Sequence, residues 1–190
     1  IRLCVSDEVK DAIEPYANGP CFTIKMGHDI PKLSRAKRYD LYILATKQPQ
    51  LGKQLFEWAK SIGLRVLIHE KATERELVHH AMAESVVVIP LPQKVEGFFL
   101  PGIEAMALAD WAVVPDCIGS REYSLSGANI SLCELDIQAC QKAILHALKK
   151  TKGWKSFISK WHGRRLSASY SLKQEQQNYH HILHQLDQIW

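Results

Sequence analysis

The sequence lacks any apolar run that approaches the ~20 residues of a transmembrane helix, and no signal-peptide pattern opens it. It also contains no CxxC pair, and its five cysteines are scattered through mostly apolar segments. An odd number of scattered cysteines argues against a disulfide framework and against a zinc site built on thiolates. We therefore expect reduced, buried thiols and a cytoplasmic protein.

An initial methionine is also missing, and the chain begins at Ile1 with the strand-like run IRLCV. We therefore expect these 190 residues to be part of a longer protein. Their number is sufficient for one well-buried core, or for one domain with a fragment of another. Apolar residues make up 46% of the chain and charged residues 23%, which is ordinary for a globular protein.

Acidic residues are absent between Asp136 and Glu175, although the net charge of the whole chain is only +4. The block between them contains nine basic residues: Lys142, Lys149, Lys150, Lys152, Lys155, Lys160, Arg164, Arg165 and Lys173. Such a block is either a solvated face or a surface that meets an anionic partner. We expect no nucleic-acid partner.

Four apolar residues in this block, Trp154, Phe157, Ile158 and Trp161, recur at the spacing of one helical stripe. The interpretation that we favour is a helix that packs this stripe on the domain. The alternative is a basic, aromatic helix within residues 149–173 that lies on an anionic membrane surface.

Short β-rich runs alternate with amphipathic stretches of helical length along the chain. Between residues 40 and 150 this alternation predicts about five strands of an open, doubly wound parallel sheet, because strands that are apolar on both faces and separated by helices form βαβ units. Ser6 is expected to cap the first helix, and Thr73 with Glu76 is expected to form a capping box on a later one. A boundary is expected within residues 27–40.

Two loops follow predicted strands and lead into helices: residues 45–53 and residues 91–101. In open parallel sheets, ligands bind at this carboxyl edge, where helix N-termini attract phosphates. Glu96 and Glu104 flank such a helix start and could accept hydrogen bonds from sugar hydroxyls. Alternatively, Glu104 only complements the helix dipole in the first turn.

The segment VEGFFLPGIEAMALADWAVVPDCIGSREYSLSGANISL resembles the nucleotide-sugar-binding motif of retaining GT-B glycosyltransferases, the glycosyl transferases of group 1 or family 4 type. That family carries the pattern E-G-F-G-L-P-x-x-E-A-M-A. The matching residues are Glu96, Gly97, Phe98, Leu100, Pro101, Glu104, Ala105, Met106 and Ala107, followed by Gly119, Glu122, Gly127 and Asn129. This chain departs from the pattern at Phe99, where the family has its second glycine.

The resemblance implies roles for the donor-binding residues. Glu96 would hold hydroxyls of the donor sugar, and Glu104 would hold the ribose hydroxyls. The backbone N–H groups of Gly97, Phe98, Phe99 and Leu100 would approach the sugar and the diphosphate.

The family also places two basic residues, six positions apart, in the loop after the first strand of the domain. Lys47 and Lys53 have that spacing and would neutralise the departing diphosphate without a metal ion or a cofactor. An equally weighted alternative is that both lysines belong to a solvated helix start.

The resemblance further implies an α/β, Rossmann-like GT-B half-domain with a remnant of the N-terminal domain and a C-terminal helix. Residues 1–30 would end the acceptor domain and form the linker, 31–170 would bind the donor, and 171–190 would form a crossover helix. The expected activity is transfer of a sugar, with retention, from a nucleoside-diphosphate sugar to a glycan or lipid-linked acceptor, and the isolated fragment is expected to be inactive. The alternatives are a non-catalytic nucleotide-sugar-binding module and a 2-epimerase. Peripheral contact with the inner membrane face remains an option.

Several histidines are interpreted as surface residues. His180, His181 and His184 are expected to form a polar helix face, since no further metal ligands accompany them. His79 and His80 are expected to face solvent or the interdomain cleft.

Overall fold

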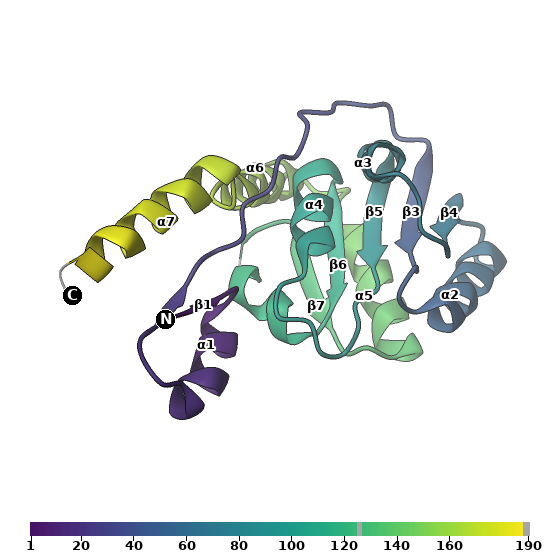
Figure 1. The fold of residues 1–190 in the computed structure, drawn as a ribbon. Coiled ribbons are helices and arrows are strands. Elements are labelled where there is room, and N and C mark those ends of the chain that lie inside the picture. Colours follow the sequence, from purple (N-terminus) through teal and green to yellow (C-terminus); the bar gives the residue numbers. More distant parts are fainter. Residues whose placement is uncertain (125–126, 188–190) are drawn as a thin grey trace.

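The computed structural model describes residues 1–124 and 127–187, so the end of the expected crossover helix, including Trp190, lies outside the described residues. Its centre is a sheet of five strands in the order β4-β3-β5-β6-β7, and every neighbouring pair is parallel (Figure 1). The strands are β3 (Tyr39–Leu44), β4 (Val66–His69), β5 (Ser85–Pro90), β6 (Trp111–Pro115) and β7 (Ile130–Cys133). This confirms the predicted α/β fold.

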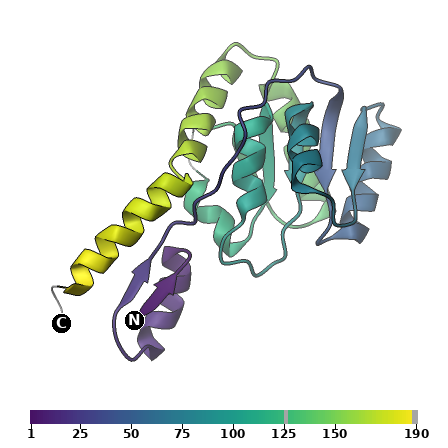
Figure 2. The same ribbon diagram turned by 45° about the horizontal axis from the view of Figure 1, so that its top comes forward.

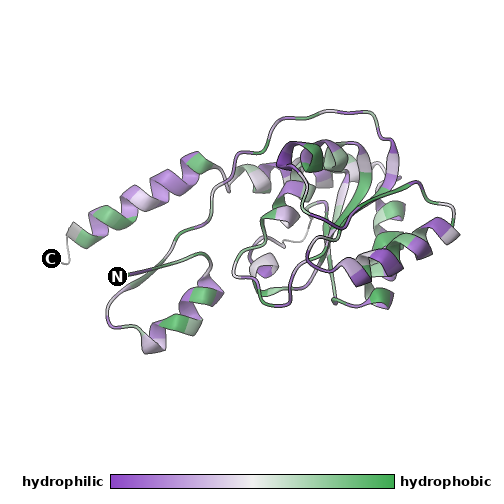
Figure 3. Cartoon of the chain, turned by 45° about the vertical axis from the view of Figure 1, so that its right-hand side comes forward, coloured by the Kyte–Doolittle hydropathy of each residue, from purple (hydrophilic) through white to green (hydrophobic). Residues whose placement is uncertain are grey.

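Helices cover both faces of this sheet, which explains why its strands are apolar throughout. Alternate residues of β3 lie in two different hydrophobic cores. On one face of the sheet, Leu41 and Ile43 pack with α2 (Pro49–Ser61) and α5 (Ile137–Lys150). On the other face, Tyr42 packs with α3 (Arg75–Ala83) and α4 (Leu100–Leu108). In Figure 3 these strands are among the most hydrophobic parts of the chain. The five cysteines are free and four of them are buried, as predicted.

A second, two-stranded parallel sheet lies at the N-terminal end, formed by β1 (Arg2–Cys4) and β2 (Cys21–Thr23). Helix α1 (Asp7–Ile13) and the short 3-10 helix η1 (Glu14–Tyr16) connect these strands. The predicted Ser6 cap is confirmed, because the Ser6 hydroxyl accepts a hydrogen bond from the Val9 N–H at 3.3 Å. The chain then crosses the face of α4 as an irregular segment before it enters β3 (Figures 1 and 2).

The predicted capping box on α3 is wrong. The helix begins at Arg75 with Glu74 as its N-cap, and no side chain caps it. The Thr73 hydroxyl instead donates to the carbonyl of Lys71 at 3.0 Å.

The packing predicted for the apolar stripe of the basic segment is also wrong. Helix α6 (Lys155–Ala168) packs on α4 through its opposite side, where Gly163 and Ser167 are buried. Trp154 and Phe157 are each 77% exposed, and Ile158 and Trp161 are about half exposed. Small residues decide this orientation, because a Cβ on Gly163 would clash with Asn129.

Helix α7 (Leu172–Asp187) extends from α6 past the domain toward the N-terminal sheet (Figure 2). Its Ile182 is buried, whereas Leu172, Tyr179 and Leu183 are about half exposed, so its apolar side is partly uncovered. No helix in the described ranges is long and apolar enough to cross a membrane.

Candidate functional site

The candidate site begins at the carboxyl edge of the sheet, where β5 leads through a loop into α4. Phe99 is the N-cap of α4 and makes no capping hydrogen bond with its side chain. Among the described residues, no acceptor takes the N–H groups of Gly97, Phe98 or Phe99. A helix start carries partial positive charge, so these donors can receive an anion.

Glu96 and Lys47 are brought together at this edge from two different strand–helix connections. The Lys47 Nζ donates to Glu96 Oε2 at 2.7 Å, and it lies 5.5 Å from the centre of the Phe99 ring. Glu96 Oε1 accepts from the Gln93 N–H at 2.6 Å. The Lys47 side chain is 40% exposed, so this pair is accessible from solvent.

The two phenylalanines of the motif contribute their backbone to this edge, because their rings pack inward. Phe99 is 1% exposed, and the Phe98 ring packs against the rings of Tyr123 and Tyr170 at 6.4 and 5.9 Å between centres. The Tyr123 hydroxyl donates to the Phe99 carbonyl at 2.7 Å.

Gly119 fixes the other side of this loop. Its N–H donates to the Glu96 carbonyl at 2.7 Å, and a Cβ at this position would lie 2.5 Å from the Phe98 Cα. Gly97 faces the N-terminal unit, since a Cβ there would lie 3.1 Å from the side chains of Val5 and Val9. At Gly119 only glycine permits this close approach, because the atoms that a Cβ would meet belong to the backbone.

Lys53 is not joined to the other predicted residues. It is the fifth residue of α2, it is exposed, and it forms no ion pair within the described ranges. Leu100 is the first residue of α4 and is half-buried.

Glu104 lies deeper than its sequence position suggests. It is the fifth residue of α4, so the alternative that it complements the dipole in the first turn is wrong. Its carboxylate is buried, and its Oε1 accepts from Arg75 Nη2 at 3.0 Å, Arg75 Nε at 3.2 Å and His79 Nε2 at 2.9 Å. All three of these donors reach the same oxygen.

Burial alone would raise the pKa of Glu104, but the hydrogen bonds and charges of His79 and Arg75 lower it below its usual value. The carboxylate is therefore ionised in the folded protein at neutral pH. His79 is 4% exposed, so the expectation that it faces solvent or a cleft is wrong.

Arg75 and His79 are the residues of this site that sequence reasoning missed. They lie four positions apart in α3, and that spacing places both on one helix face. The sequence does not predict that both residues contact Glu104, because α3 and α4 come together only in the folded chain.

A second polar pair lies nearby in the sheet. The Tyr42 hydroxyl and His69 Nδ1 are 2.8 Å apart. Burial raises the pKa of Tyr42, and the charge of Glu104 raises it further. Tyr42 is therefore a neutral hydroxyl at the edge of the Glu104 cluster.

No group of three or more histidine, cysteine or acidic residues within the described ranges could hold a metal ion. His180, His181 and His184 are exposed on α7. This agrees with the polar helix face expected from the sequence.

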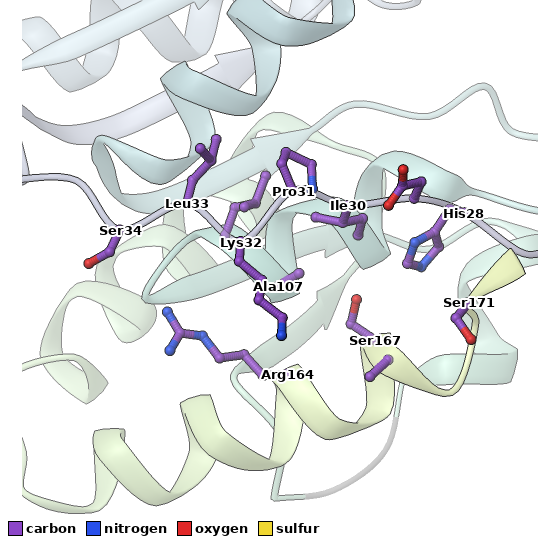
Figure 4. Close-up of a pocket in the computed structure, with 13 residues that line it drawn as sticks. His28, Ile30, Pro31, Lys32, Leu33, Ser34, Ala107, Arg164, Ser167 and Ser171 are labelled. Carbon is purple, nitrogen blue, oxygen red and sulfur yellow. The ribbon is translucent and has the colours of Figure 1, made fainter. Parts of the chain in front are cut away.

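The structure also contains a cavity of about 500 Å³ that no predicted site residue lines (Figure 4). It lies between residues 28–34, the last turn of α4, and α6 with Ser171. This cavity was not predicted from the sequence, because its lining residues come from three distant segments.

No protein-family model and no curated protein sequence matches this chain. Solved structures do match its fold. They include sucrose-phosphate synthase from Thermosynechococcus elongatus, with a TM-score of 0.70 and 13% identity over 99% of this chain and 58% of that chain. HepE from Anabaena in complex with UDP matches with a TM-score of 0.71 and 15% identity over 96% of this chain and 63% of that chain.

The pneumococcal O-GlcNAc transferase GtfA in complex with UDP and GlcNAc matches with a TM-score of 0.63 and 11% identity over 96% of this chain and 44% of that chain. The chain therefore spans about half of the length of these structures. At such identities the likeness concerns the fold alone. This chain has the fold of a half-domain of the GT-B glycosyltransferases.

Proposed function

We propose that this chain is the donor-binding half of a retaining, metal-independent GT-B glycosyltransferase. It would bind a nucleoside-diphosphate sugar, and the enzyme would transfer the sugar to a glycan or lipid-linked acceptor. The observation that carries this proposal is the arrangement around α4. Free N–H donors and the Lys47–Glu96 pair lie at its start, and a buried carboxylate lies one turn further on.

The asymmetry of Glu104 supports its assignment to the ribose. Arg75 and His79 hold Oε1, and within the described residues no donor reaches Oε2. An ionised carboxylate with one anchored oxygen can accept a ribose hydroxyl on the other without losing its own support. Glu104 would thus be preorganised for ribose recognition, which reduces the conformational entropy that is lost on binding.

The opposite charges at the start of α4 support the assignment of Lys47 and Glu96 to the reacting end of the donor. A diphosphate would take Lys47 as its counter-ion, and Glu96 would then be released to accept hydroxyls of the sugar. As the bond to the sugar breaks, negative charge grows on the leaving phosphate. A fixed ammonium group and helix N–H donors stabilise that charge. Lys53 would add a second, solvent-facing cation.

One observation favours a non-catalytic nucleotide-sugar-binding module as the second candidate. Both oxygens of Glu96 already have partners within the chain, Lys47 and the Gln93 N–H. A carboxylate held in this way could be purely structural.

Calorimetric titration with UDP, GDP and dTDP tests donor binding. We expect one nucleoside diphosphate to bind, and Lys47→Ala to weaken it about tenfold, because a charge-assisted contact is lost. Binding of the nucleoside alone should not change. Lys60→Ala is the matched control, since Lys60 lies over the Phe56 ring on the same helix as Lys53. Absence of binding for all three nucleotides would refute both candidates.

An assay for the release of nucleotide from the bound donor separates the two candidates. The assay uses an acceptor extract and the protein that the full-length gene encodes. A transferase should release nucleotide only when acceptor is present, and Glu96→Ala should abolish the release. A binding module should release none. Conversion of the donor without acceptor would indicate the 2-epimerase.

We also propose that the exposed side of α6 contacts an anionic membrane surface. Trp154, Phe157 and Trp161 project from it with the cations Lys155 and Arg165, which lie over the Trp154 and Trp161 rings at 5.6 and 5.1 Å. Amphipathic aromatic groups among cations suit the boundary of anionic lipids.

Sedimentation with vesicles tests this contact. The chain should bind phosphatidylglycerol vesicles and not phosphatidylcholine vesicles, and Trp154→Ser with Phe157→Ser should abolish binding. Tyr16→Ser is the control, because Tyr16 is even more exposed, at 87%, but lies on η1. Equal binding to both vesicles, or an equal loss in the control, would contradict the proposal.

A further inference from the structure

The cavity of about 500 Å³ behind α4 has the size of a binding site for a small molecule. One wall is the irregular segment 28–34 that precedes β3, and the other walls are the end of α4 and the inner side of α6 (Figure 4). Ile30, Pro31, Leu33, Ala107 and Leu108 make much of this lining apolar. An apolar lining with a few polar groups is typical of pockets that hold an organic ligand.

His28 is a polar group of the described lining whose ring has no hydrogen-bond partner. It lines the cavity and is only 7% exposed, and neither of its ring nitrogens has a hydrogen-bond partner among the described residues. Buried polar groups are almost always hydrogen-bonded, because leaving one unpaired costs about 1–3 kcal/mol. Burial also lowers the pKa of His28, so the ring is neutral and can donate one hydrogen bond and accept another.

Two cations face the same space from opposite walls. Lys32 belongs to the irregular segment and Arg164 to α6, and neither forms an ion pair within the described ranges. Among the described lining residues, Asp29 is the only one with a carboxylate. Ser167 and Ser171 add hydroxyl groups on the same side as His28 (Figure 4). The lining therefore carries an excess of positive charge and of hydrogen-bond donors beside an apolar wall.

We propose that this cavity is a second ligand site, which binds a small organic anion with a short apolar body, either a carboxylate or a phosphate monoester. Arg164 and Lys32 hold the anionic group. His28 supplies a further donor, and the aliphatic wall takes the apolar body. Arginine suits this role because its planar fork matches carboxylate and phosphate oxygens.

The cavity lies at the opposite end of α4 from the helix start of the candidate donor site, and Glu104 is not among its described lining residues. The N–H donors of the donor site lie at Gly97–Phe99, whereas the cavity is lined by Ala107 and Leu108. A helix C-terminus disfavours anions, but here Asn129 Nδ2 donates to the carbonyls of Met106 and Ala109 at 3.0 and 3.4 Å. This contact offsets part of the negative end of the dipole.

Calorimetric titration of the chain with defined probes tests the proposal. Hexanoate and hexyl phosphate distinguish the two anionic groups, hexan-1-ol lacks the charge, and acetate and inorganic phosphate lack the apolar body. We expect saturable binding of hexanoate, hexyl phosphate or both. Hexan-1-ol, acetate and inorganic phosphate should each bind about tenfold more weakly or not at all. Whichever anion binds more tightly identifies the ligand class.

Two neighbouring arginines provide a matched pair of variants. Arg164→Gln should weaken binding about tenfold, because a charged hydrogen bond is lost. Arg165→Gln removes the same charge one residue away, where the guanidinium lies over the Trp161 ring, and should leave binding unchanged. His28→Leu should also weaken binding without lowering the melting temperature, since it removes an unpaired buried polar group.

Three outcomes would overturn the proposal. The first is the absence of saturable binding for both hexyl anions, and the second is equal weakening by Arg164→Gln and Arg165→Gln. The third is displacement of the bound anion by UDP, because it would make the cavity part of the donor site.

Discussion

Glu96 and Glu104 lie eight residues apart on one loop–helix segment, and their side chains are only 10% and 7% exposed, yet the fold gives them different kinds of partner. Glu96 lies on a loop beside an exposed lysine that belongs to another loop. Glu104 is buried and holds two side chains of α3 on one oxygen. The first carboxylate has a partner that water or a ligand can replace, whereas the second is part of the contact between two helices.

The difference concerns how strongly the fold depends on each carboxylate. The Lys47–Glu96 pair should contribute about 1 kcal/mol to stability, because the Lys47 side chain is 40% exposed and water competes for its charge. A buried carboxylate with matched donors contributes little net stability as a pair, but the loss of one partner leaves the other uncompensated. Substitutions at Glu104 should therefore affect folding as well as the proposed ribose binding, whereas substitutions at Glu96 and Lys47 should affect mainly binding.

The largest expected effect is on the folding of Glu104→Ala. We expect this change to lower the free energy of unfolding by about 1–3 kcal/mol, because His79 would remain buried without an acceptor. Arg75 is half exposed and can turn to water. Urea denaturation measures the change.

Glu104→Gln sharpens this test, because the amide oxygen can still accept from His79 while the charge is removed. It should lose clearly less stability than Glu104→Ala, and both should weaken binding of a nucleoside diphosphate if Oε2 holds the ribose. Unchanged stability in Glu104→Ala would break the comparison between the two carboxylates.

The fall in the free energy of unfolding at acidic pH should depend on Glu104. The pKa of Glu104 in the folded protein lies below the ordinary 4.5. The ionised carboxylate therefore contributes its full stabilisation above pH 4.5, and this stabilisation is lost as the pH falls through the folded-state pKa. Glu104→Gln should therefore show a flatter fall in stability below pH 4.5 than the parent. Parallel curves for the two proteins, measured by urea denaturation at several pH values, would exclude this role.

A smaller effect on stability is expected for Lys47→Ala, about 1 kcal/mol, since the Lys47 side chain is 40% exposed and the Glu96 carboxylate, whose side chain is 10% exposed, keeps the Gln93 N–H as a donor. Its main effect should be on nucleoside diphosphate binding, which should also become less sensitive to salt because a cation is lost. Lys53→Ala should reduce binding less, as Lys53 is not joined to the Glu96 loop. If Lys53→Ala weakens binding more than Lys47→Ala does, the order assigned to the two lysines is wrong.

The smallest effect is expected for the stability of Glu96→Gln, within about 0.5 kcal/mol of the parent. The amide oxygen can still accept from the Gln93 N–H. A thermal melt measures this, and a loss comparable to that of Glu104→Ala would remove the distinction between the two sites.

The parallel sheet was predictable because its signals are local. Runs such as 40–46 and 86–91 are apolar on both faces and are separated by stretches of helical length, which few architectures other than a doubly wound sheet can bury. The capping box at Thr73 failed for the opposite reason. A cap depends on where the helix starts, and in the folded chain α3 starts at Arg75, two residues after Thr73, whose hydroxyl donates to the carbonyl of Lys71.

The sequence by itself determined the α/β fold, the Ser6 cap and the position of the Glu96–Glu104 segment at the carboxyl edge, because periodicity and spacing act over neighbouring residues. Only the tertiary structure decided that Glu104 contacts Arg75 and His79, that Lys47 and not Lys53 pairs with Glu96, and that the aromatic stripe of α6 faces outward. These outcomes depend on which segments meet after the chain has folded. Small residues let helices approach closely, as Gly163 does against Asn129. Their spacing in the sequence does not indicate which residues they will contact.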